Sequence, residues 1–115
     1  MKVAILAIAL TLLSGCAWPT YDKAILASVK AEARALQKAY PTMDFEQVPK
    51  EAWPKTIASL KPELVFVSID GVDILTKPYF DGGWGYFVVI DDGVAPQPEG
   101  RYSKLGEGIY WSHPY

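Results

Sequence analysis

The chain has 115 residues, of which 50% are hydrophobic, and it carries 11 basic and 13 acidic residues for a formal net charge of -2. This length suits one small domain, and the charge lacks the basic excess typical of nucleic-acid-binding proteins, so nucleic acid is excluded as an expected partner. A single cysteine cannot form an intrachain disulfide, so packing must stabilise the folded part.

Residues 1–15 have the composition of an export signal. Lys2 supplies a positive start, and an apolar run from Val3 to Leu13 follows, interrupted only by Thr11. A helix that crosses a hydrocarbon core needs about 20 apolar residues, so this run is too short for a stable membrane span. We therefore expect a signal peptide that is removed after export.

Leu13-Ser14-Gly15-Cys16 resembles the lipobox of bacterial lipoprotein signal peptides. In that family the cysteine thiol receives a lipid, a dedicated peptidase cuts before the cysteine, and the new amine is commonly acylated. The resemblance implies a lipidated Cys16, a short tether over residues 16–20 and a single domain over residues 21–115. The alternative is a conventional cleavage site in which Cys16 is an ordinary small residue.

The resemblance also implies a location in the cell envelope. Two or three acyl chains on Cys16 would hold the protein in a lipid bilayer permanently, whereas one chain binds only marginally. Ala17 is not the aspartate that retains many Gram-negative lipoproteins in the inner membrane. In a Gram-negative host we therefore expect the outer membrane, with the domain facing the periplasm.

A long amphipathic helix is predicted from Tyr21 to Tyr40, with Thr20 as its cap and Pro41 at its end. Its apolar side chains recur at helical spacing: Tyr21, Ile25, Val29, Ala33, Leu36 and Tyr40. This stripe indicates a helix that covers a sheet, and a partner-binding or membrane-lying helix is the alternative. A short second helix is predicted over residues 54–60.

Two strands of a hairpin are predicted at Glu63–Ile69 and Val72–Lys77, on either side of Asp70-Gly71. An Asp-Gly pair supplies the positive φ angles of a two-residue turn. In the resulting register Ile69 faces Val72, Val67 faces Ile74 and Val65 faces Thr76. These side chains form an apolar face, which we expect to lie against the helix.

Two further strands are predicted, at Tyr86–Ile90 and Ile109–Ser112, with loops over residues 78–85 and 94–101. The Asp91-Asp92 pair after the third strand is expected to discourage pairing at a sheet edge. Helices followed by strands indicate an α+β fold, in which the long helix and the short second helix pack on one face of a four-stranded antiparallel sheet.

The sequence offers little support for an enzyme or a cofactor site. The glycines of residues 82–85 are not followed by the lysine of a phosphate loop, and His113 has no metal-ligand spacing around it. The aspartates lack the spacing of a calcium loop, although paired carboxylates for glycoside cleavage stay an alternative because their separation is spatial. We predict no catalytic residue, no metal and no cofactor.

Most of the aromatic residues lie from Tyr79 onward. A domain of this size cannot easily bury all of them, so they form either a binding face or a second small core under the long loop. The candidate binding residues are Tyr79, Phe80, Trp84, Tyr86, Tyr110 and Trp111.

These features predict a membrane-anchored, non-enzymatic lipoprotein that binds another protein of the cell envelope. The acylated Cys16 would contact the lipid bilayer, and the sheet face or the segment 79–86 would contact the protein partner. An inhibitor or immunity protein against an exported lytic enzyme or toxin is one alternative. Carbohydrate or peptidoglycan binding through the aromatic side chains is the other.

Overall fold

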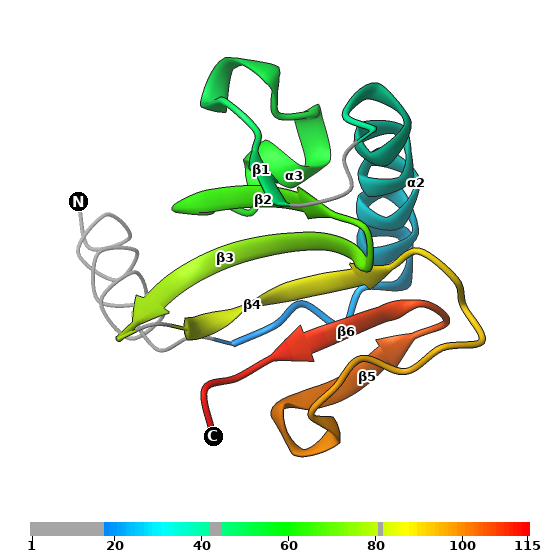
Figure 1. Cartoon of the computed structure of the whole chain (residues 1–115), viewed down its shortest axis with the longest axis vertical. Helices are drawn as coiled ribbons and strands as arrows, with labels where there is room; N and C mark the ends of the chain where they lie inside the picture. The colour runs from blue at the N-terminus through cyan, green and yellow to red at the C-terminus, as the bar shows by residue number, and fades with distance from the viewer. Residues whose placement is uncertain (1–17, 42–44, 81) are drawn as a thin grey trace, which may run out of the picture.

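The computed structural model describes residues 18–41, 45–80 and 82–115. A long helix, α2 (Lys23–Ala39), packs on one face of an antiparallel sheet, and a short helix, α3 (Lys55–Ser59), packs against α2 (Figure 1). In the described residues the sheet has six strands, in the order β1-β2-β3-β4-β6-β5. The strands are β1 (Phe45–Gln47), β2 (Leu64–Ser68), β3 (Gly71–Tyr79), β4 (Gly82–Val89), β5 (Tyr102–Gly106) and β6 (Ile109–Ser112).

The α+β class is confirmed, with one long helix and an antiparallel sheet, but the prediction of four strands was wrong. β1 was missed because its three residues are all exposed and show no alternation. β5 was missed because Lys104 and Gly106 interrupt its apolar pattern. The helices also differ in number, since the described residues add two 3-10 turns, η1 (Lys50–Ala52) and η2 (Glu99–Arg101).

The segment predicted as a loop at residues 78–85 is instead the end of β3 and the beginning of β4. A register shift between Leu75 and Lys77 bulges β3, and Pro78 then lies opposite Gly83 beyond the bulge. Proline has no N–H for the sheet ladder, which is why the sequence argued against a strand here. The long β3–β4 hairpin carries its turn out to one end of the molecule (Figure 1).

The turn between β2 and β3 lies one residue earlier than predicted, at Ile69 and Asp70. Each residue of β2 therefore pairs with a residue of β3 two positions earlier than predicted. A shift of two residues keeps the faces of the strands. The inner face is buried at Val65, Val67, Val72 and Ile74, whereas Ile69 is exposed. Gly71 lies in the sheet and not in the turn, opposite Ser68 and Val89. A Cβ there would lie 2.1 Å from the Val88 carbonyl oxygen of β4, so the position requires glycine.

Helix α2 begins at Lys23, later than predicted, because Asp22 is its cap. Asp22 Oδ1 accepts hydrogen bonds from the backbone N–H of Ala24 at 2.9 Å and of Ile25 at 3.1 Å. Thr20, the predicted cap, instead accepts a hydrogen bond from the Asp22 N–H at its Oγ1 atom. The helix start is therefore set by an aspartate that follows the predicted cap.

The core lies between α2 and the inner face of the sheet. Tyr21 and Ile25, which belong to the predicted helix stripe, are exposed, and Leu26 is buried in their place. Trp53 packs against this core and donates from Nε1 to the Val48 carbonyl oxygen at 3.1 Å. The buried set is Leu26, Val29, Ala33, Leu36, Val48, Ile57, Val65, Val67, Val72, Ile74, Tyr86, Val88, Ile109 and Trp111.

Glu32 of α2 caps the first turn of α3. Its carboxylate accepts hydrogen bonds from the backbone N–H of Thr56 at 3.1 Å and of Ile57 at 2.9 Å. Pro54, at the N-cap position of α3, makes no side-chain hydrogen bond, and Glu32 satisfies two of the free N–H groups at the helix start. This contact holds α3, with its buried Ile57, against α2.

Glu32→Ala is expected to lower the free energy of unfolding by about 1–2 kcal/mol, because two backbone N–H groups lose a charged acceptor. Glu51→Ala, at an exposed position of η1, is the control. It should change the stability by less than about 0.5 kcal/mol. Urea unfolding followed by circular dichroism measures both variants, and equal stability of the two would show that the cap contributes nothing.

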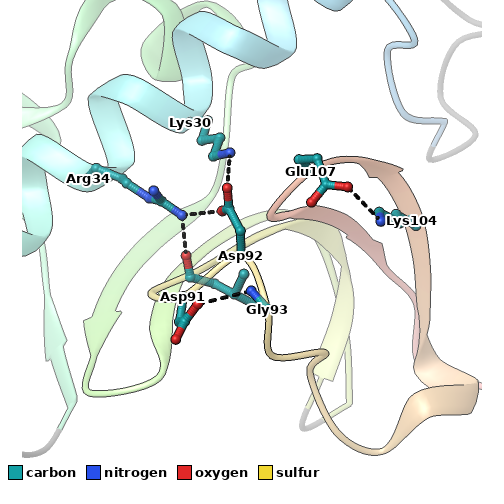
Figure 2. A network of polar contacts seen from close by, with 8 residues as sticks. Lys30, Arg34, Asp91, Asp92, Gly93, Lys104 and Glu107 are labelled. Atoms are coloured by element: carbon teal, nitrogen blue, oxygen red, sulfur yellow. Dashed lines mark hydrogen bonds and ion pairs between the residues drawn. The ribbon is translucent and has the colours of Figure 1, made fainter.

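Asp92 joins the segment after β4 to helix α2 (Figure 2). Its carboxylate lies 2.8 Å from Lys30 Nζ and 2.5 Å from the Arg34 guanidinium, which also donates to the Val89 carbonyl oxygen. Hydrogen bonds from Lys30 first, and then from Arg34, hold the pKa of Asp92 below its usual range. The prediction that Asp91 and Asp92 protect a sheet edge was wrong, because β4 lies between β3 and β6.

Candidate functional site

The face of the sheet opposite α2, here called the outer face, carries a groove of about 440 Å³. Phe66, Asp73 and Phe87 lie side by side on this face, because they pair across β2, β3 and β4 and alternate with buried core residues. β1, η2 and the chain after β6 form the walls. The lining of the groove includes Phe45, Phe66, Asp73, Leu75, Tyr102 and Pro114.

Asp73 places a carboxyl group at the floor of this groove. Its neighbours Val72 and Ile74 are fully buried in the core, so strand alternation turns Asp73 outward. Burial among the groove residues raises the pKa of Asp73 to about 6, and no hydrogen bond from the described residues lowers it again. A carboxyl group shifted in this way inside a groove is a candidate for ligand binding.

Aromatic rings stand on both sides of Asp73. On one side Phe45 stacks on Phe66, with ring centroids 4.5 Å apart. On the other side is Tyr102. Burial, and then the charge of Asp73, raise the pKa of Tyr102, while the positive Arg101 lowers it. The site therefore combines one carboxylate with two aromatic walls.

A second cavity of about 590 Å³ continues the outer face beneath the loop after β4. Phe87 and Tyr102, whose ring centroids lie 5.7 Å apart, line it together with loop residues 94–97. Both rings are only half-buried, so the loop covers a cavity and does not close a second core. Tyr102 lines both cavities.

The aromatic candidates do not form one surface. Tyr86 and Trp111 are 4% and 7% exposed, with ring centroids 5.1 Å apart, so they belong to the core under α2 and present no open surface. Tyr110 is half-buried on the outer face, opposite Phe87. Cys16, the predicted lipidation site, lies outside the described residues.

Tyr79, Phe80 and Trp84 meet at the tip of the β3–β4 hairpin together with Tyr115, and we call these four side chains the aromatic end. The Tyr79 ring centroid lies 4.6 Å from that of Phe80, 5.4 Å from that of Trp84 and 6.0 Å from that of Tyr115. Lys77 Nζ lies 5.5 Å from the centre of the Trp84 ring. Phe80 and Tyr115 are 89% and 79% exposed, so the cluster is open to solvent.

Asp73 and Tyr102 were missed as functional candidates. The sequence could have indicated Asp73 as a candidate, since it is a charged residue at an outward position within the apolar strand segment 72–75. Tyr102 was not singled out within the aromatic-rich region, because the strand that positions it was not predicted and its electrostatic interaction with Asp73 joins distant parts of the chain.

One serine and the only histidine also meet near this groove. Ser103 Oγ lies 3.2 Å from His113 Nε2, and His113 Nδ1 lies 2.8 Å from the Tyr115 carbonyl oxygen. The backbone N–H of His113 donates a hydrogen bond to the Arg101 carbonyl oxygen at 2.9 Å, which ties the chain after β6 to η2. These contacts hold His113 at the rim of the groove.

Neither a metal-binding cluster nor a membrane-spanning helix is found in residues 18–41, 45–80 and 82–115. These residues hold no group of three or more His, Cys, Asp or Glu side chains able to bind a metal ion. None of the helices there is long and apolar enough to cross a membrane. In comparisons with known proteins, no family model, curated protein or solved structure matches the chain.

Proposed function

We propose that the protein is a non-enzymatic bacterial lipoprotein, anchored to an envelope membrane by the acylated Cys16. In this proposal its outer-face groove binds a segment of another envelope protein that presents a lysine or arginine side chain. The observation that supports the proposal is Asp73, a carboxylate at the floor of an open groove with aromatic rings on both sides.

Charge and burial favour a cationic ligand. An ionised carboxylate that has lost part of its water gains most from a partner that brings a positive charge and hydrogen-bond donors. The rings of Phe66 and Tyr102 would add cation–π contacts to an ammonium or guanidinium group within about 6 Å. An apolar or acidic ligand would leave the Asp73 carboxylate buried and unpaired, which costs free energy.

The groove leaves this position free for an external cation. Arg101 lines the same groove at an exposed position. Among the salt bridges of the described residues none joins Arg101 to Asp73, and the pKa of Asp73 shows the effect of burial alone. A volume of about 440 Å³ accommodates a few side chains of a bound segment and not a folded domain.

Asp73→Asn is expected to weaken binding of the partner, because the amide keeps the shape of the side chain and removes its charge. A benzophenone amino acid in place of Phe45, which is 61% exposed in the groove wall, reports contacts by photo-crosslinking in intact cells. We expect an adduct with an envelope protein whose crosslinked peptide carries a lysine or arginine beside the crosslink. Its yield should fall about tenfold with Asp73→Asn, which corresponds to about 1.4 kcal/mol.

Asp70→Asn is the matched control for this experiment. It removes a carboxylate from the exposed turn between β2 and β3, outside the groove lining, and should leave the adduct unchanged. An undiminished adduct with Asp73→Asn, a crosslinked peptide without a basic residue, or an adduct with a glycan would each contradict the proposed ligand.

A further inference from the structure

The aromatic end lies at the tip of the β3–β4 hairpin, where Tyr79, Phe80 and Tyr115 are exposed and Trp84 is partly buried against the core. Phe80, in the turn, has a φ of 54° and is 89% exposed. A left-handed backbone costs a non-glycine residue about 1–2 kcal/mol. The hairpin therefore keeps an apolar ring in solvent at a conformational cost, which points to a use for that ring outside the folded domain.

The start of the described chain lies at the same end of the molecule (Figure 1). The Thr20 N–H donates a hydrogen bond to Tyr86 Oη at 2.8 Å, and Tyr86 lies close to Trp84 in β4. Four residues of fully extended chain span at most about 14 Å, so Cys16 cannot lie farther than this from Thr20. A lipid on Cys16 would thus enter the membrane beside the aromatic end.

We propose that the aromatic end rests in the headgroup region of the membrane that holds Cys16, an inference that rests on the lipid anchor of the proposed function. Tyrosine and tryptophan are favoured at the membrane–water interface, because each ring has an apolar body and a polar group. Trp18, which is 74% exposed, lies two residues after Cys16 in the sequence and adds a further interfacial ring.

The acyl chains supply the attachment, and the aromatic end sets the orientation. A short tether holds the cluster at a high effective concentration near the bilayer, so a contact too weak to bind membranes alone suffices to orient an anchored domain. Phe80 and Gly82 line the same groove as Asp73. One end of that groove therefore faces the bilayer surface, and its ligand is a membrane-proximal segment of the partner.

A fluorophore at the hairpin tip tests this orientation. With Cys16 lipidated, the variant Gly82→Cys has one free thiol, which takes an NBD label. A Cβ on Gly82 meets nothing within 4 Å, so the cysteine that carries the label fits without a backbone shift. Gly93→Cys is the matched control, because it is an exposed glycine beyond the opposite end of β4.

The lipidated protein is reconstituted into vesicles of phosphatidylethanolamine and phosphatidylglycerol. NBD emission from position 82 should rise several-fold, shift to the blue and be quenched by brominated lipids, while position 93 stays unchanged. Adding Phe80→Ser to the Gly82→Cys protein should remove most of this rise. Equal emission from the two positions, or a rise that appears without vesicles as two copies associate, would overturn the proposal.

Failure of the lipid anchor is detected separately. Cys16→Ala should move the protein from the membrane fraction to the soluble fraction of cells. A variant that still sediments with membranes would overturn the anchor, whatever the label reports. A soluble Cys16→Ala variant together with equal emission from positions 82 and 93 would leave the anchor standing and reject docking of the aromatic end.

Discussion

Gly85→Ala should unfold the domain or lower its free energy of unfolding by more than about 3 kcal/mol. Gly85 lies in β4 opposite Leu75, where β3 begins to bulge. A Cβ at this position would lie 2.1 Å from the Ile74 carbonyl oxygen and 2.9 Å from Leu75 Cα. These are backbone atoms of the neighbouring strand, which cannot move away without breaking the β3–β4 ladder. Because small domains are stable by only about 5–15 kcal/mol, this loss is large.

Gly82→Ala is the control for this variant, with urea unfolding followed by tryptophan fluorescence. It lies in the same strand, but a Cβ there meets nothing within 4 Å. The expected change in the free energy of unfolding is therefore below about 0.5 kcal/mol. Unfolding of both variants at the same urea concentration would show that β3 and β4 do not approach closely at Gly85.

Asp73→Asn should raise the free energy of unfolding at neutral pH by about 2 kcal/mol, although the same change is expected to weaken binding of the partner about tenfold. Burial raises the pKa of Asp73 from its ordinary 3.8 to about 6. Each pKa unit corresponds to about 1.4 kcal/mol, and access of water to the half-buried carboxylate reduces the full effect. A gain of stability with a loss of function is typical of residues kept for binding.

The pH dependence of this effect has a definite sign. Between about pH 4 and pH 6 the folded state binds more protons at Asp73 than the unfolded state does, so the free energy of unfolding falls as the pH rises. Below about pH 4 the carboxyl group is neutral in both states and costs nothing, and above about pH 6 the penalty is complete. The variant and the natural protein should therefore be equally stable at about pH 4 and differ in stability at neutral pH.

Urea unfolding at a series of pH values measures this difference. Asp70→Asn, in the exposed turn between β2 and β3, is the control and should change the free energy of unfolding at neutral pH by less than about 0.5 kcal/mol. If Asp73→Asn were less stable than the natural protein at neutral pH, its carboxylate would make a stabilising contact within the domain. That outcome would contradict an unpaired group that waits for a cationic ligand.

Local patterns predicted which side chains of the first hairpin face the helix. Val65, Val67, Val72 and Ile74 are all fully buried, because alternation along a strand needs no knowledge of distant neighbours. The pairing register could not be predicted in the same way. The Asp70-Gly71 pair is typical of a turn, and only the position of β4 shows that Gly71 is needed for close approach to Val88.

The aromatic candidates show the same limit. Sequence identified a region rich in rings, but it could not separate Tyr86 and Trp111, which are buried under α2, from the exposed Phe80. Burial of a ring depends on which other elements cover it, and those elements come from distant parts of the chain. The edge strands β1 and β5 were missed for a related reason, since their pairing partners and not their own composition make them strands.

By itself the sequence determined the amphipathic helix, the inner face of the β2–β3 hairpin and the α+β class, because hydrophobic periodicity encodes each of them locally. The lipid anchor on Cys16 stays a prediction from the same source. Only the tertiary structure decided the surroundings of Asp73, where β1, η2 and the chain after β6 converge around a single carboxylate. Desolvation depends on all the neighbours that exclude water, so a site of this kind exists only once the distant segments have packed together.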